Sequence, residues 1–533
     1  MNERIKEICK PYHLYLFGLL LLAASQPLSR FMVSVSQFWL VGAWILHGNF
    51  AEKWLQFKMN KIVWLLPSLW LIHVVWLIGT DDWAMAFKDI KIKLPLLLLP
   101  IIVGTMPRLT VLHVKLIVYT LAVSCLIASV YDLVIYHVRN IEDPRNMSVF
   151  ISHIRFSLYI NVVILFILYE IYENHKSLHH IFKIVAFSML IWFVVFLFLL
   201  QSFTGIIILI ICLVIFFLKI IFSVPHRLIK LLTIAVLFIL LSLPFIYLNK
   251  AIKDFYTIKD DLQKIDNFSG KGNRYSNDYK QSTIENGHYT GLYVCDVELI
   301  ESWNKRSKIP LSGLDAKGKY IYYTLIRYLT SRGLRKDYTG VYSLSIKDIQ
   351  NIEAGIPNII FEDRSKINVK IYELIWQLDV YFKGGNSSGH SVTQRIEYLK
   401  VGWYIFSRHI WFGIGTGDSF IEFSKAYIVT KSDMDREYRH HSHNQLFTFL
   451  ITFGCVGSLW IFLVLVYYFY YGIKNKLFMF SIFYTIAFLS FLNEDTFETQ
   501  AGSTFFAFFY CVFLFTTNNQ DLADSDKPKS VIP

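Results

Sequence analysis

The chain has 533 residues, of which 54% are hydrophobic and only 17% charged, whereas soluble domains carry about 45–50% apolar and about 25% charged residues. Its formal net charge of +12 is as large as that of many nucleic-acid-binding proteins. The basic residues, however, lie mostly in short segments between apolar runs, which is typical of membrane topology. Composition and charge therefore exclude a soluble protein, argue against nucleic-acid binding and predict a polytopic membrane protein.

Apolar runs of near 20 residues recur along the chain, the length that a hydrocarbon core of roughly 30 Å requires. We therefore expect an all-α polytopic membrane protein with about twelve transmembrane helices. The fourth run is short and contains two prolines, so we expect it to be broken or preceded by an interfacial segment. The predicted spans are 11–28, 31–49, 62–80, 94–106, 111–135, 152–172, 181–200, 203–222, 229–248, 444–471, 477–493 and 501–517.

An even number of spans places both termini on the same side of the membrane. The short segments on that side carry a clear excess of Lys and Arg over those on the other side, so the positive-inside rule places the termini in the cytoplasm. One large extracytoplasmic domain of mixed and helical character then lies between the ninth and tenth spans. The predicted parts are an N-terminal bundle (1–249), this loop domain (250–442), three C-terminal helices (443–517) and a cytoplasmic tail (518–533).

The loop domain is too long for an ordinary connection and must contain structure of its own. Residues 286–307 combine short β-branched and aromatic stretches with polar residues. Residues 319–337 predict an amphipathic helix closed by Gly333, and residues 343–356 predict a helix that Ser345 caps and that ends near Gly355.

The stretch 391–418 has apolar residues at helical spacing, including Leu399 and Trp403. It predicts an amphipathic helix along the membrane surface that ends at Gly413. The turn that follows contains Gly413, Gly415 and Gly417, but without a preceding strand or a following helix it is poor evidence of nucleotide binding.

Residues 443, 447, 450, 454 and 457 are spaced by four and three residues, which predicts that they share one face of a single helix. Gly454 and Gly457 on that face would let another helix or a lipid chain approach the backbone below His443. One interpretation is a packing contact with an interfacial histidine. A second is a general base, since a neutral imidazole accepts a proton near neutral pH.

A metal site is a third interpretation of this region, since His440, His441, His443, Asp433 and Asp435 are candidate ligands. The chain lacks an HExxH arrangement and any CxxC pair, which argues against zinc. We therefore expect no metal.

His443-Asn444, followed after nine residues by Gly454-x-x-Gly457, resembles the signature of the O-antigen ligase and Wzy polymerase superfamily. Arg395, Trp403 and the three glycines 413, 415 and 417 resemble a second element of that family, and SHIRFSLYI (152–160), with His153 and Arg155, resembles a third. The family's first loop arginine has no single counterpart, since Arg274, Arg327 and Arg332 all qualify. The loop part between about 260 and 390 is longer than is usual in the family.

The resemblance implies a GT-C-like glycosyltransferase of the bacterial inner membrane with a periplasmic active site. It would transfer a glycan from undecaprenyl pyrophosphate to a hydroxyl of lipid A–core, with membrane lipid as surroundings. Because the donor is already activated, no ATP or cofactor is expected. His443 would accept the acceptor proton and be oriented by Asn444 or His441. Arg395 would bind the pyrophosphate, and Arg155, beside His153, is either a second cation or an interfacial anchor.

An O-antigen polymerase or a protein O-oligosaccharyltransferase would share these motifs. The single large loop directly before the histidine motif favours the ligase. A transporter of lipid-linked sugars is disfavoured because the spans are nearly free of charge, with Asp132 and Glu170 near their ends, and because the halves show no repeat. A glycan-binding scaffold would need one span rather than twelve.

Overall fold

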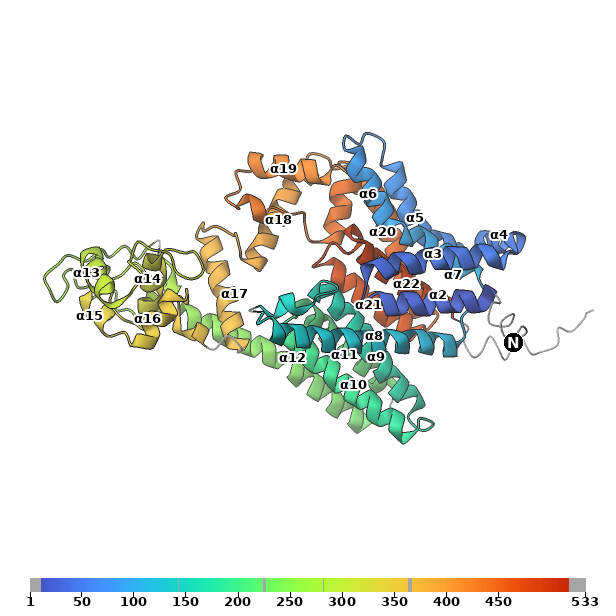
Figure 1. Ribbon diagram of the computed structural model, residues 1–533, viewed down its shortest axis with the longest axis horizontal. Coiled ribbons are helices and arrows are strands. Elements are labelled where there is room, and N and C mark those ends of the chain that lie inside the picture. Colours follow the sequence, from blue (N-terminus) through green and yellow to red (C-terminus); the bar gives the residue numbers. More distant parts are fainter. Residues whose placement is uncertain (1–10, 142, 224–226, 281, 363–366, 517–533) are drawn as a thin grey trace, which may run out of the picture. The chain divides into compact units, whose positions relative to one another are not determined.

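The computed structural model describes residues 11–141, 143–223, 227–280, 282–362 and 367–516 (Figure 1). The predicted cytoplasmic tail 518–533 lies outside these ranges. The described chain forms two compact units. The first comprises the described parts of Met1–Pro225, Tyr398–Lys431 and His440–Pro533, and the second those of His226–Glu397 and Ser432–Arg439. The predicted ninth span therefore groups with the loop domain and not with the N-terminal bundle.

The first unit is all helical, and a helix lies in each of the eleven predicted spans that belong to it. These helices are α2 (Pro11–Ser25), α3 (Arg30–His47), α5 (Lys61–Val75), α7 (Pro95–Thr105), α8 (Val111–Val138), α9 (His153–Asn174), α10 (His180–Leu199), α11 (Phe203–Ser223), α20 (Gln445–Lys474), α21 (Phe478–Phe491) and α22 (Gln500–Leu514). Shorter elements are α4 (Phe50–Met59), α6 (Trp83–Lys93), α19 (Ser419–Val429), η1 (Pro144–Met147) and η4 (Thr496–Glu498). Helix α6 is the segment expected before the short fourth run.

Five helices of the described chain, α8, α9, α10, α11 and α20, are long and apolar enough to cross a membrane. A sixth span results if α3 and α4, which meet at a bend of 111°, count as one. The chain is thus an integral membrane protein, and the total of twelve spans stays a prediction.

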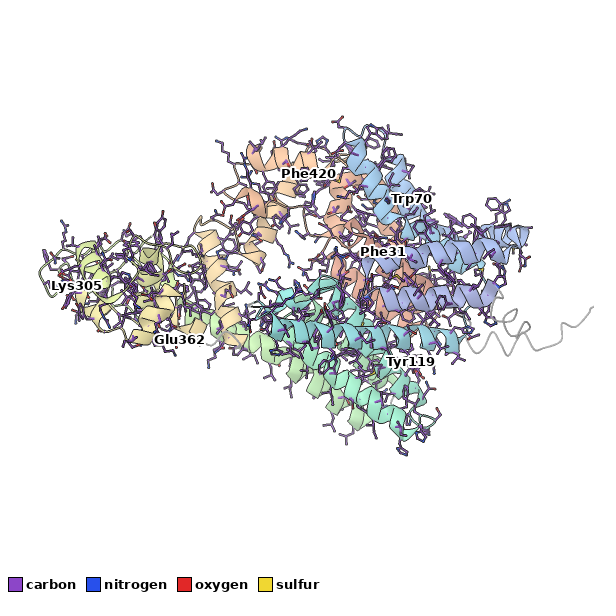
Figure 2. All side chains as sticks on the ribbon, viewed as in Figure 1. Phe31, Trp70, Tyr119, Lys305, Glu362 and Phe420 are labelled. Atoms are coloured by element: carbon purple, nitrogen blue, oxygen red, sulfur yellow. The ribbon has the colours of Figure 1, made fainter. Side chains whose placement is uncertain are left out.

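Helix α22 is the centre of the first unit, because every residue from Gly502 to Leu514 is buried. Its phenylalanines pack against those of α21, as in the contact of Phe506 with Phe491. On the outer surface the side chains are also apolar: Phe31 of α3 is 75% exposed (Figure 2). Exposed apolar surface of this extent is costly in water and stable in lipid.

The second unit contains the long helix α12 (Arg227–Tyr256), a two-stranded sheet and a set of short helices. Strands β1 (Ile284–Glu285) and β2 (His288–Tyr289) pair antiparallel, with Ile284 opposite Tyr289. The other elements are α13 (Asp296–Arg306), α14 (Ile321–Ser331), α15 (Tyr338–Tyr342), α16 (Ile346–Glu353), η2 (Ile359–Glu362), α17 (Ile367–Phe382), the start of α18 (Ser391–Phe406) and η3 (Arg436–Tyr438). Its core includes Trp303, Leu325 and Tyr328.

Two local predictions for the loop domain are confirmed. Helix α14 lies within 319–337 and is followed by Gly333, whose φ of 66° ends it. Helix α16 begins with a capping box, in which the Ser345 side chain accepts from the N–H of Asp348 and the Asp348 carboxylate accepts from the N–H of Ser345.

Helix α18 ends at Phe406, so the prediction that it continues to Gly413 is wrong. After the bond from Ser407 N to Trp403 O, the next N–H groups donate only three residues back, which tightens the chain into turns. Leu399 and Trp403 are 40% and 61% exposed, while Tyr398 on the other side of the helix is buried. That α18 lies along the membrane surface stays a prediction.

Candidate active site

Helix α20 is broken at Gly454, whose φ of 60° and ψ of −166° are not helical. The backbone of residues 410–415 inserts into the break and takes over the hydrogen bonds that the helix loses. The N–H groups of Ile414 and Gly415 donate to the carbonyls of Ile451 and Thr452 (3.0 Å each), and those of Cys455 and Val456 donate to the carbonyls of Ile410 and Trp411 (2.7 and 3.0 Å). These four bonds keep the carbonyls of Ile451 and Thr452 and the N–H groups of Cys455 and Val456 paired in an apolar helix, where an unpaired backbone group is costly.

The prediction that His443, Gly454 and Gly457 share one face of a single helix is therefore wrong. Gly454 interrupts the helix, and His443 precedes it. Asn444 is the N-cap, and its side-chain oxygen accepts from the N–H of Phe447 at 3.0 Å. Spacing alone does not reveal a break that a distant loop stabilises.

The motif glycines stand where a side chain would collide with backbone or with a fixed ring. A Cβ at Gly413 would lie 2.3 Å from the carbonyl oxygen of Thr452, and one at Gly454 would lie 2.4 Å from that of Trp411. At Gly457 the indole ring of Trp76 would be 2.8 Å away. The element that approaches the helix below the histidine segment (440–443) is thus the glycine-rich loop (410–417), together with Trp76.

The same loop is also held by the end of α5. The Trp76 indole N–H donates to the carbonyl of Phe412 at 2.7 Å, and the Thr416 N–H donates to the carbonyl of Trp76 at 3.0 Å. The Thr416 hydroxyl donates to the carbonyl of His73 at 2.7 Å. At Gly417 a Cβ would lie 2.7 Å from Ala86 of α6, and Gly415 has a φ of 92°. The loop therefore fixes α5, α6 and α20 relative to one another.

His443 lies in the left-handed backbone region, with φ of 48°. Its N–H donates to Oδ2 of Asp495 at 2.9 Å, and its ring lies 5.4 Å from that of Tyr398. The Thr448 hydroxyl donates to the other carboxylate oxygen of Asp495 at 2.7 Å. Burial raises the pKa of Asp495 to about 7. The ring of His440 is 5.9 Å from that of His443.

His441 lines a cavity of about 350 Å³ of which His440 and His443 are not lining residues. Its Nδ1 lies 3.3 Å from the hydroxyl of Ser419, and burial lowers its pKa. The cavity is lined by His73, Met85, Lys88, Asp89, Ile92, Lys93, Gly417, Ser419, Phe420, His441, Thr448, Phe449, Thr452, Phe453 and Glu498. Polar and aromatic side chains around a concave space are what a ligand site requires.

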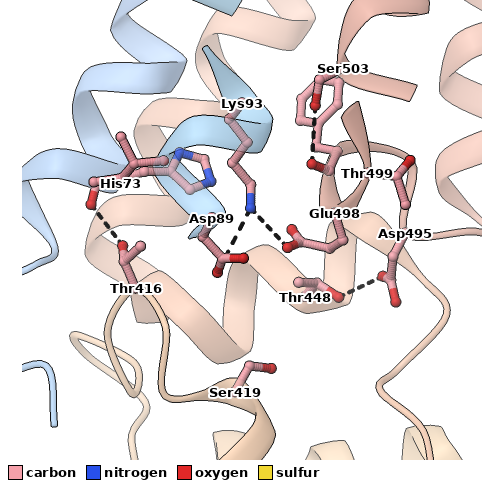
Figure 3. Close-up of polar contacts among 12 residues, drawn as sticks. His73, Asp89, Lys93, Thr416, Ser419, Thr448, Asp495, Glu498, Thr499 and Ser503 are labelled. Atoms are coloured by element: carbon pink, nitrogen blue, oxygen red, sulfur yellow. Dashed lines mark hydrogen bonds and ion pairs between the residues drawn. The ribbon is translucent and has the colours of Figure 1, made fainter. Parts of the chain in front are cut away.

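Lys93 is the central charge of this cavity. Its side chain is 1% exposed, and its Nζ lies 2.8 Å from Glu498 and 4.0 Å from Asp89 (Figure 3). The sequence does not predict this cluster, since Lys93 bears there only on the orientation of the chain. Lys93 is the last residue of α6 and is followed by Pro95 and Pro100, which is the local signal that the sequence offers.

Arg155 and His153 begin α9, which Ser152 caps. The charges of Glu494, Asp495 and Arg30 act on the Arg155 guanidinium. Arg155 therefore belongs to the same polar region as the histidine segment. Asn444 caps α20 and donates through Nδ2 to the carbonyl of Leu492 at 3.1 Å.

Arg395 lies in the part of α18 that belongs to the second unit, one turn before Tyr398. Its association with His443 stays a prediction. Of the other loop arginines, Arg327 pairs with Glu285 at 2.6 Å and Arg332 with Asp348 at 2.5 Å. Within the described ranges, no group of three or more His, Cys, Asp or Glu side chains is arranged to hold a metal ion.

Comparison with known proteins bears on this region. The family model described as O-antigen ligase (Wzy_C) matches residues 345–462, a range that contains Arg395, the glycine-rich loop and the segment His443–Gly457. No curated protein matches the chain. Residues 345–462 are therefore similar to the O-antigen ligase domain, and this match supports the resemblance to the O-antigen ligase and Wzy superfamily.

Proposed function

We propose that this protein is an O-antigen ligase, which transfers a glycan from undecaprenyl pyrophosphate to a hydroxyl of lipid A–core at the periplasmic face of the inner membrane. The observation that carries the proposal is the position of His443. It lies inside the matched range, its backbone is fixed by Asp495, its ring packs against Tyr398, and it stands at the start of a membrane helix.

In the proposed reaction, the acceptor hydroxyl oxygen attacks the anomeric carbon of the carrier-bound sugar. A new C–O bond forms while the bond to the pyrophosphate oxygen breaks, and that oxygen keeps the bonding electrons. His443 takes the acceptor proton as general base. One displacement of this kind inverts the configuration at the anomeric carbon.

The leaving pyrophosphate needs positive charge in a water-poor site. Arg395 would bind it through paired, charge-assisted hydrogen bonds, which the planar guanidinium forms better than an ammonium group. Arg155 would be the second cation, in line with its place beside Glu494 and Asp495. No step of this scheme uses ATP or a metal, because the pyrophosphate ester is already activated.

The experiment is glycan transfer by the purified protein with carrier-linked donor and lipid A–core, in chelator and without ATP or an ion gradient. The informative variant is His443→Asn, since asparagine tolerates the left-handed backbone that His443 adopts but does not accept a proton near pH 7. We expect transfer to fall about 100- to 10,000-fold. His409→Asn is the matched control, because His409 is exposed in the same unit, and it should transfer normally.

Normal transfer by His443→Asn would refute the general-base role. Movement of the carrier-linked sugar across a vesicle membrane, with no glycan product from donor and acceptor, would indicate a transporter instead. A deletion strain separates ligase from polymerase on a lipopolysaccharide gel. Loss of long-chain material with accumulated carrier-linked glycan indicates the ligase, whereas core with a single repeat indicates the polymerase.

A further inference from the structure

A cavity of about 310 Å³ lies within the second unit. Its volume is at the lower end of ligand pockets, which span about 300–1,000 Å³. Helices α14 and α17 and the segment after α16 enclose it. The lining residues that bear on its chemistry are Lys317, Lys319, Arg327, Lys370, His390 and the ring of Trp376.

The lining is strongly cationic. Four lysine and arginine side chains line the cavity against one carboxylate, that of Glu373. The Arg327 charge is compensated from behind by Glu285, which is fully buried, and Lys370 lies 3.7 Å from Glu373. Lys317 donates through Nζ to the carbonyl of Gly355 at 2.6 Å, and Lys319 adds a further positive charge to the lining. Burial and the charge of Lys319 lower the pKa of His390, which reflects the same positive potential.

Aromatic rings form the other part of the lining. The ring of Tyr323 is 63% exposed, so its surface is accessible to a ligand. The Arg327 guanidinium lies 3.9 Å from the centre of the Trp376 ring and holds it in place. The Trp376 indole N–H is buried and has no hydrogen-bond partner among the described residues. An unsatisfied buried donor in a cavity wall is costly in the empty protein and available to a ligand.

We propose that this cavity binds an acidic sugar residue, a pyranose ring that carries a carboxylate. The lysines attract the carboxylate, the aromatic rings pack against the C–H face of the sugar, and Gln377, Glu373 and the Trp376 N–H can serve its hydroxyls. That this sugar belongs to the glycan being transferred rests on the proposed function. The binding itself does not depend on it.

The test is calorimetric titration of the purified full-length protein with a glucuronate-containing disaccharide and with its carboxyl-reduced, neutral counterpart. We expect the acidic disaccharide to bind at least about tenfold more tightly, with an affinity that falls as salt rises. Lys319→Gln and Lys370→Gln should each weaken its binding about three- to tenfold. Lys308→Gln removes the same charge from an exposed site of the same unit and should leave the affinity unchanged.

Equal affinity for the two disaccharides, or unchanged binding in both lysine variants, would overturn the proposal. Inorganic phosphate that binds as tightly as the acidic disaccharide would overturn the saccharide class, because the ring would then contribute nothing. The His443→Asn variant separates the two proposals: it should lose glycan transfer and keep wild-type disaccharide binding. Binding that fails while transfer proceeds refutes only the cavity, and the reverse refutes only the transferase.

Discussion

Lys93 Nζ lies 2.8 Å from Glu498 although the two residues are 405 positions apart in the chain. The pair joins the end of α6 to η4, the turn that leads into the buried helix α22. Because the lysine side chain is 1% exposed, its ammonium group does not have water as an alternative partner. The ion pair therefore fixes the wall of the cavity that His441 faces.

Removing the charge of Glu498 should be strongly destabilising. Among the described residues, Glu498→Gln leaves the buried Lys93 ammonium with Asp89, at 4.0 Å, as its remaining ion-pair partner, and removing one partner of a buried ion pair costs on the order of 3–5 kcal/mol. We expect a clear fall in the thermal unfolding midpoint of the purified protein.

The Lys219–Glu173 pair provides the comparison, since its atoms lie 2.7 Å apart but its side chains are 28% and 42% exposed. Glu173→Gln should cost at most about 1 kcal/mol. Equal midpoints for the two variants would show that the Lys93 pair is not a buried, compensated one.

The insertion of the glycine-rich loop into α20 makes a second prediction. Gly413→Ala would force an alanine to a φ of 70° and bring its Cβ to 2.3 Å from the Thr452 carbonyl oxygen. The left-handed conformation alone costs about 1–2 kcal/mol, and the clash adds to it. We expect a lower unfolding midpoint and loss of glycan transfer.

Gly42→Ala is the matched control for that variant. Gly42 lies inside α3, and a Cβ there would have nothing within 4 Å, so alanine should be neutral or slightly stabilising in the helix. A Gly413→Ala protein as stable as Gly42→Ala would mean that the loop does not occupy the break.

Hydropathy was sufficient to locate the helices, because a membrane helix is specified by a local run of apolar residues. Local signals likewise identified α16, where Ser345 and Asp348 form the capping box within four residues. The candidate site differs in kind. Gly454 leaves the helix because the backbone around Trp411 replaces its hydrogen bonds, and no pattern near residue 454 encodes that partner.

The buried ion pair could not be predicted for the same reason. Lys93 follows other lysines in an amphipathic segment, where a solvated role is the ordinary expectation. Only the packing of α6 against η4 brings Glu498 to it. The role of a charged residue near the end of an apolar helix therefore depends on distant packing and is difficult to predict from the sequence.

A third prediction concerns Arg395. If it binds pyrophosphate in a bidentate manner, Arg395→Lys should reduce glycan transfer nearly as much as His443→Asn, because lysine cannot reproduce the planar fork. The measurement is the rate of product formation at saturating donor. Arg408→Lys is the control: Arg408 is exposed and stacks on Tyr404 at 3.7 Å, and its replacement should leave transfer unchanged. Full activity of Arg395→Lys would exclude the bidentate role.

The last prediction concerns pH. Burial raises the pKa of Asp495 from an ordinary 3.8 to about 7, so between about pH 4 and 7 the folded protein binds a proton that the unfolded chain has released. Stability falls with rising pH wherever the folded state binds more protons. The unfolding midpoint should therefore decrease from about pH 4 to 7 and level off above.

Asp495→Asn isolates this contribution. The amide can accept from the N–H of His443 and donate to the Thr448 hydroxyl, so it keeps the geometry but does not titrate. Burial also raises the pKa of Asp89, to about 6, which acts in the same direction and remains in the variant. The difference between wild type and Asp495→Asn should thus grow from pH 4 to 7. A difference that stays constant over that range would show that the carboxyl beneath His443 is already ionised at pH 4.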